Sequence, residues 1–149
     1  MFKNFFKTKK EDPESQDFSA SEIASGAFRI ERKTNYFHKK SICEDGKLYN
    51  TETATKVIES NKEKASWYGS YRVRTYFITA KGNWFSCDTF IEPGRREYMK
   101  KVGGIDVKVE EADVTYMDLR LESTKKVKSI LGATDITIYK KYFGEVEEG

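Results

Sequence analysis

A run of aromatic and β-branched residues over residues 67–91 places the strongest constraint on how this chain folds. Two arms rich in residues that favour β-structure flank a short polar segment, residues 81–83. Gly82 in that segment supplies the positive backbone angle that tight hairpin loops need. The run therefore predicts two antiparallel strands joined by a tight turn.

The first arm of this hairpin separates two kinds of side chain. Its odd-numbered positions are mostly apolar, while its even-numbered positions carry tyrosines and arginines. Because side chains alternate across a strand, we expect the odd positions to pack into a core and the even positions to face outward. The even positions, with a lysine in the turn and two arginines beyond it, form the predicted binding surface: Tyr68, Arg72, Arg74, Tyr76, Lys81, Arg95 and Arg96.

This predicted surface has three interpretations. Rings that stack on bases and arginines that bind phosphates suit single-stranded nucleic acid. The same residue types are enriched at the centres of protein interfaces, and tyrosine also suits an ordinary solvated sheet face. The net charge of the 149-residue chain is only +3, which is low for a nucleic-acid-binding protein. We therefore expect a protein partner ahead of nucleic acid, and an exposed aromatic face would equally serve a homodimer.

Composition predicts a polar N-terminal segment followed by one domain. Residues 1–25 are rich in charged residues and serine, and we expect them to be flexible. Phe2, Phe5 and Phe6, beside Lys3 and Lys7, leave open a short amphipathic turn against a membrane surface or a partner. Residues 26–149 are expected to form a single α+β domain, an antiparallel sheet with the central hairpin and short flanking helices.

Local signals predict the elements around the hairpin. Alternating residues predict further strands at residues 27–32, 36–43, 105–109 and 114–121. Capping residues and apolar spacing predict helices at residues 52–59, 95–102, 124–131 and 136–143. Asp45 and Gly46 signal a turn, Pro93 and Gly94 are expected to end a strand, and the acidic run 110–113 is expected to be a solvated turn.

The residue types that carry catalysis and metal binding are sparse. His38 is the chain's single histidine and has no carboxylate near it in sequence, so we expect a partly exposed strand histidine and not a base. Cys43 and Cys87 are far apart and fit two half-buried free thiols. No glycine-rich phosphate loop occurs. We therefore expect no catalytic residues, metal or cofactor, and no enzymatic activity.

The N-terminus lacks the apolar core of a secretory signal, and no segment approaches the length of apolar residues that spans a membrane. These features predict a cytoplasmic protein.

Three segments resemble a known group of proteins. Residues 47–54 (KLYNTETA) are similar to a K-x-Y-[DN]-T-E-T-A opening, and residues 76–85 (YFITAKGNWF) to a following Y-x-T-x-x-G-x-[FW]-F hairpin. Residues 139–148 (YKKYFGEVEE) are similar to a closing Y-x-x-[IY]-F-G-E-V-E-E segment. The group consists of small accessory proteins of phages, plasmids and integrative or conjugative elements in low-GC Gram-positive bacteria. Residues 86–96 replace the glycine-rich loop usual in that group, and residues 1–45 are additional.

The resemblance implies a mobile-element origin, and hence the cytoplasm of a bacterial host, more than it implies a mechanism. Such elements carry many compact proteins that block host defences by binding, including anti-CRISPR proteins, which is an argument by analogy. We therefore expect a non-enzymatic protein that binds a host protein or defence complex. The alternative is a small nucleic-acid-binding accessory or regulatory protein.

Overall fold

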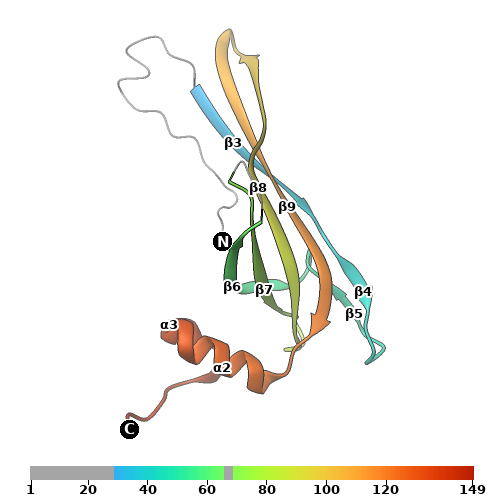
Figure 1. Cartoon of the computed structure of the whole chain (residues 1–149), viewed down its shortest axis with the longest axis vertical. Coiled ribbons are helices and arrows are strands. Elements are labelled where there is room, and N and C mark those ends of the chain that lie inside the picture. The colour runs from blue at the N-terminus through green and yellow to red at the C-terminus, as the bar shows by residue number, and fades with distance from the viewer. Residues whose placement is uncertain (1–28, 66–68) are drawn as a thin grey trace. The chain divides into compact units, whose positions relative to one another are not determined.

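The computed structural model describes residues 29–65 and 69–149, a mixed α+β arrangement dominated by strands (Figure 1). The strands are β3 (Arg29–Phe37), β4 (Lys40–Ile42), β5 (Leu48–Asn50), β6 (Thr55–Lys64), β7 (Tyr71–Ile78), β8 (Trp84–Val102) and β9 (Ile105–Leu121). The helices are α2 (Thr124–Thr134) and α3 (Ile136–Phe143). One sheet has five strands in the order β3-β9-β8-β7-β6, and a second sheet pairs β4 with β5.

The chain divides into two compact units, and strands β8 and β9 run through both. The described residues of the first unit are 29–37, 64–65, 69–71 and 90–114. Those of the second unit are 38–63, 72–89 and 115–149. That residues 26–149 behave as one domain stays a prediction, and the flexible segment 1–25 lies outside the described residues.

The central hairpin is confirmed as β7 and β8, which are neighbours in the sheet. In the turn between them, the Thr79 amide donates to the Asn83 carbonyl at 2.9 Å and Gly82 has a φ of 85°. A connection this short makes the two strands antiparallel. Trp67 and Tyr68, which the sequence placed in the first arm, lie outside the described residues.

The predicted end of the second hairpin strand is wrong, because β8 continues through Pro93 and Gly94 to Val102. The helix predicted at residues 95–102 is therefore a strand. Gly103 and Gly104, which the sequence predicts to end that helix, form a turn instead. Both have positive φ, 58° and 80°, as a two-residue hairpin turn requires. These two glycines join β8 to β9. The acidic run 110–113 lies within β9, so the prediction that it is a solvated turn is wrong.

The helix predicted at residues 52–59 is also wrong. Asn50 does bind the backbone ahead of it, since its side-chain oxygen accepts from the Glu52 amide at 2.9 Å. The Asn50 carbonyl then accepts from the Ala54 amide at 3.1 Å, which closes a turn, and strand β6 follows. The same capping chemistry thus starts a turn here instead of a helix.

The two C-terminal helices are confirmed. Ser123 is the cap that the sequence predicts for the first helix, and of the two caps that it allows for the second, Thr134 and Asp135, the structure has Asp135. The Ser123 side chain accepts from the Lys126 amide to begin α2, and the Asp135 side chain accepts from the Ile138 amide to begin α3. The sequence predicts that the first of these helices ends at Gly132, but α2 continues to Thr134.

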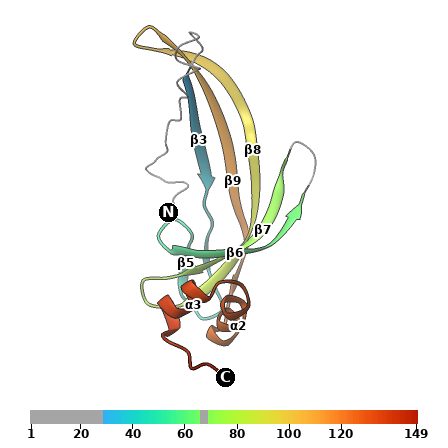
Figure 2. The same ribbon diagram turned by 90° about the vertical axis from the view of Figure 1, so that its left-hand side faces the viewer.

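Both faces of the β7–β8 hairpin are covered in the second unit. On one face, Tyr76 and Trp84 pack against Val127 and Leu131 of α2, with partly buried residues of α3 around them. Figure 2 shows the ribbons of α2 and α3 beside the β7–β8 turn. On the other face, Phe77 stacks on Phe85, and the ring of Tyr49 from β5 meets Phe85 edge-on. Among the described residues of the first unit, the buried apolar side chains are Ile91, Val107, Val109 and Val114.

Candidate functional site

The structure does not assemble the predicted binding surface. Arg72 and Lys81 are exposed, but Arg74 and Tyr76 are only 8% and 3% exposed. The expectation that these two residues face outward is wrong, because α2 packs on Tyr76 and polar groups of β8 and β9 surround Arg74. Arg95 and Arg96 are exposed but belong to the first unit, and Tyr68 lies outside the described residues.

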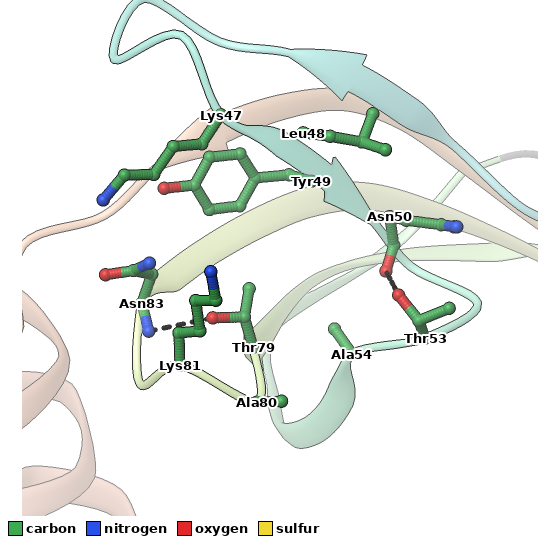
Figure 3. A pocket seen from close by; sticks show the side chains of 10 residues that line it. All are labelled: Lys47, Leu48, Tyr49, Asn50, Thr53, Ala54, Thr79, Ala80, Lys81 and Asn83. Atoms are coloured by element: carbon green, nitrogen blue, oxygen red, sulfur yellow. Dashed lines mark hydrogen bonds between the residues drawn. The ribbon is translucent and has the colours of Figure 1, made fainter.

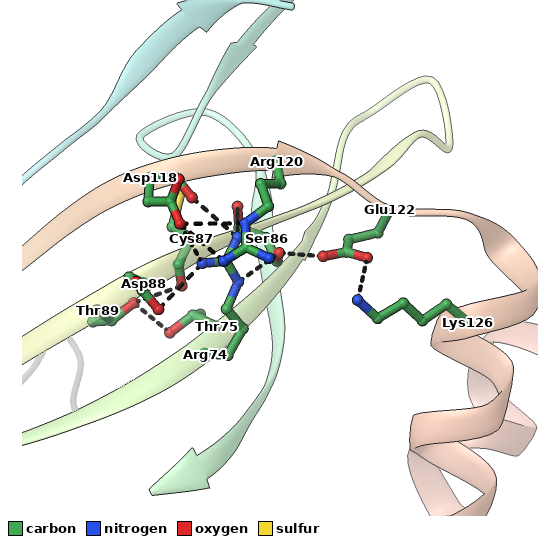
Figure 4. Close-up of polar contacts among 10 residues, drawn as sticks. All are labelled: Arg74, Thr75, Ser86, Cys87, Asp88, Thr89, Asp118, Arg120, Glu122 and Lys126. Atoms are coloured by element: carbon green, nitrogen blue, oxygen red, sulfur yellow. Dashed lines mark hydrogen bonds and ion pairs between the residues drawn. The ribbon is translucent and has the colours of Figure 1, made fainter. Parts of the chain in front are cut away.

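Arg74 is instead the centre of a buried polar network (Figure 4). Its Nε donates to the Ser86 hydroxyl at 2.8 Å, and its Nη2 donates to the carbonyls of Asp118 and Ser86 at 3.0 and 3.3 Å. Its Nη1 forms ion pairs with Asp88 at 3.2 Å and with Asp118 at 3.4 Å. All three guanidinium nitrogens are therefore engaged within the protein, which indicates a structural role.

The network continues from the sheet to helix α2. The Ser86 hydroxyl donates to Glu122, whose side chain is 4% exposed, and Lys126 of α2 pairs with the same carboxylate at 3.1 Å. A hydrogen bond from Arg120 lowers the pKa of the Asp118 carboxyl. A small cavity of about 250 Å³ lies beside this network, and Arg72 lines it. Because carboxylates offset most of its cations, the cavity has little preference for an anion.

Arg96 of the first unit also has partners. It pairs with Glu111 at 3.1 Å and with Asp113 at 2.6 Å, on carboxylates that are nearly buried. Tyr98 and Asn35 donate to Glu111 as well, and these three donors, the Tyr98 hydroxyl first, lower its pKa to about 2. These contacts give Arg96 a role in stabilising the sheet, whereas the sequence predicts that it binds a partner.

A second cavity, of about 430 Å³, lies between the β4–β5 sheet and the turn of the β7–β8 hairpin (Figure 3). We call it the lysine cavity, because Lys47 and Lys81 extend over it while no carboxylate belongs to its lining. Its volume lies in the range of ligand-binding pockets. The lining residues are Lys47, Leu48, Tyr49, Asn50, Thr53, Ala54, Thr79, Ala80, Lys81 and Asn83.

Neither lysine side chain of this cavity makes a hydrogen bond or ion pair with the described residues. The walls are held by local bonds: the Asn83 amide donates to the Thr79 hydroxyl at 3.0 Å, and the Thr53 hydroxyl donates to the Asn50 carbonyl at 3.4 Å. The cavity therefore offers two unpaired positive charges on an ordered frame. All of its lining comes from two segments, residues 47–54 and 76–85.

An exposed apolar pair adjoins the cavity on the β4–β5 sheet. The antiparallel register places Ile42 opposite Leu48, and these side chains are 72% and 60% exposed. The next pair along the two strands, Ser41 and Tyr49, faces the opposite side of the sheet, and Tyr49 is buried. Sequence reasoning missed this pair because it assigned Leu48 to a helix-capping segment. The turn signal at Asp45 and Gly46, between two runs that suit strands, could have revealed it.

The histidine and the cysteines do not form a reactive centre. His38 is exposed, stacks on Tyr116 and contacts the Thr51 hydroxyl at 2.9 Å; partial burial lowers its pKa. Cys43 is half-buried and Cys87 is fully buried, and both are free thiols. Burial raises the pKa of Cys87 to about 12, which suppresses the reactive thiolate. Among the described residues, no group of three or more histidines, cysteines and carboxylates is placed to hold a metal ion.

The fold and the cavity define a mixed α+β protein with a basic cavity beside an exposed apolar strand pair. Comparison with protein-family models, with curated proteins and with solved structures finds no match. Within the described ranges, neither helix has the length and apolar character needed to cross a membrane.

Proposed function

We propose that this chain is a non-enzymatic accessory protein of a phage or mobile element that acts by binding a host protein, such as a component of a defence complex, and inhibiting it. The observation that carries the proposal is the exposed pair of Ile42 and Leu48 beside the two unpaired lysines of the cavity. The resemblance of residues 47–54, 76–85 and 139–148 to mobile-element proteins supports the origin.

The chemistry of this surface favours a protein partner. Two large apolar side chains that stand side by side gain free energy when a partner removes them from water. Such a patch matches the apolar centre of protein interfaces, where a few residues carry most of the binding energy. Lys47 and Lys81, at the border of the patch, favour a partner that presents acidic groups there.

Nucleic acid remains the second candidate, because two unpaired lysines also suit phosphates. The stacking that the sequence analysis expected is not available from Tyr76, which is buried under α2. The first candidate therefore has the stronger support.

The test is a pull-down from a lysate of the natural bacterial host, divided into nuclease-treated and untreated halves. The tagged baits are the wild-type chain, the variant Ile42→Asp/Leu48→Asp, and a control variant Ile136→Asp/Val146→Asp. Ile136 and Val146 are similarly exposed, at 63% and 55%, but lie in and after α3. Circular dichroism establishes that all baits are folded, and the captured protein is then purified and titrated against each bait.

We expect a host protein that survives nuclease treatment, binds the wild type and the control equally, and binds Ile42→Asp/Leu48→Asp at least about tenfold more weakly. Equal binding by all three baits would remove the strand pair from the interface. Loss of every captured molecule after nuclease treatment would favour the nucleic-acid candidate instead. Light scattering on the purified chain distinguishes a monomer from a homodimer, which the same face could form.

A further inference from the structure

The lysine cavity differs from the other charged regions of the second unit in the balance of its charges. Around Arg74, each cation that belongs to the network faces a carboxylate within 4 Å. At the lysine cavity, Lys47 and Lys81 have no such partner among the described residues. Two like charges held near one cavity repel each other unless an anion enters between them. Asp45 in the adjoining turn interacts with Lys47 electrostatically without forming an ion pair, so the cavity keeps a positive charge that an anionic ligand can neutralise.

The adjoining turn carries two acidic residues, Glu44 and Asp45, and Asp45 is already engaged. Asp45 accepts from the Tyr49 hydroxyl at 2.5 Å and from the Lys47 amide at 3.0 Å. The Tyr49 hydroxyl, first, and the Lys47 amide lower the pKa of Asp45, so it stays ionised and fixed in place. This carboxylate orients the start of β5, and it is not part of the cavity lining.

The rest of the lining is apolar or able to hydrogen-bond. Leu48, Ala54 and Ala80 supply apolar surface, while side-chain hydroxyls and amides supply donors and acceptors. A cavity of about 430 Å³ is much larger than a single small anion needs. The lining therefore suits a ligand that combines negative charge with apolar groups and hydrogen-bonding groups.

From this arrangement we infer that the lysine cavity receives an acidic segment of the protein partner, with carboxylates on Lys47 and Lys81 and an apolar side chain against Leu48. The inference rests on the proposed function and names the chemistry of the partner. Continuity with the exposed Ile42–Leu48 pair places the segment at the edge of the same interface. Single-stranded nucleic acid fits less well, because Tyr49, the aromatic residue of the described lining, is 3% exposed and cannot stack on a base.

The test uses labelled model ligands and fluorescence anisotropy at low ionic strength, and so does not require the natural partner. The first probe is a peptide of alternating glutamate and leucine, and the second is the same peptide with glutamine in place of glutamate. The third is single-stranded oligothymidine of equal charge to the acidic peptide. The proteins are the wild type, the variant Lys47→Glu/Lys81→Glu, and the control Lys125→Glu/Lys141→Glu, which makes the same change of net charge on exposed helix positions.

We expect the acidic peptide to bind the wild type and the control alike, and to bind Lys47→Glu/Lys81→Glu about tenfold more weakly or not at all. The glutamine peptide should bind more weakly than the acidic peptide. Failure of the wild type to bind the acidic peptide, or equal weakening by the control, would overturn the inference. Tighter binding of oligothymidine that depends on Lys47 and Lys81 would assign the cavity to nucleic acid. In each case the pull-down with Ile42→Asp/Leu48→Asp still tests the proposed function separately.

Discussion

At the scale of single residues, the carboxylate of Glu111 shows how a strand accommodates a nearly buried charge. Arg96, Tyr98 and Asn35 all donate to it, and they come from two strands of the first unit. A charge that receives several donors costs little to bury, whereas the same charge without them is expensive. The sequence could not predict that residues 110–113 lie in a strand, because the partners of their carboxylates are distant in sequence.

The depressed pKa of Glu111 predicts how stability depends on pH. Its folded pKa of about 2 lies below the ordinary value of 4.5, so its contribution is complete above pH 4.5 and is lost as the pH falls toward 2. Glu111→Gln should therefore lower the free energy of unfolding by about 2 kcal/mol at neutral pH, and this difference should shrink in acid. Urea unfolding at a series of pH values measures it.

The control for this prediction is Glu97→Gln, which changes a half-exposed carboxylate on the neighbouring strand β8. It should alter stability by less than about 0.5 kcal/mol. A difference between wild type and Glu111→Gln that stays constant from neutral pH to about pH 3 would contradict the assigned role.

At the scale of elements, helix α2 is fixed to the hairpin mainly by two residues. Val127 and Leu131 are 1% and 0% exposed and contact the cluster that contains Tyr76 and Trp84. Leu131→Ala should therefore destabilise the protein by about 2–5 kcal/mol, through lost burial and the cavity it leaves. Thermal or urea unfolding measures the loss.

Ile136→Ala on α3 is the matched control, because Ile136 is 63% exposed. Its effect should stay within about 0.5 kcal/mol. Equally small effects of Leu131→Ala and Ile136→Ala would contradict the packing of α2 on the hairpin face.

The elements that could be predicted from the sequence are those specified by nearby residues. Gly82 fixes the hairpin turn, and Ser123 and Asp135 begin the two helices, as predicted. Strand β6 and the second half of β8 could not be predicted, because only pairing with distant strands makes them extended. In the candidate site, alternation placed Arg74 and Tyr76 on the correct face, but it could not indicate that a helix later in the chain would cover that face.

At the scale of the whole molecule, the two compact units share β8 and β9, so we expect them to unfold in one transition. Arg74→Ala in the second unit and Glu111→Gln in the first should each shift that single transition to lower temperature. Arg72→Ala, at an exposed position two residues from Arg74, should leave it unchanged. Differential scanning calorimetry measures the transitions. Two transitions, each moved by one substitution alone, would show that the units unfold independently and that residues 26–149 are not one domain.

The order of the elements along the chain has a consequence for biosynthesis. The ribosome makes β7 and β8 before it makes α2 and α3, so the face with Tyr76 and Trp84 emerges before its cover. Until α2 arrives, these rings and the Arg74 network lack the contacts that shield them from water. We therefore expect the nascent chain to expose this aromatic face for a time, and the second unit to complete its folding only after residues 124–143 have left the ribosome.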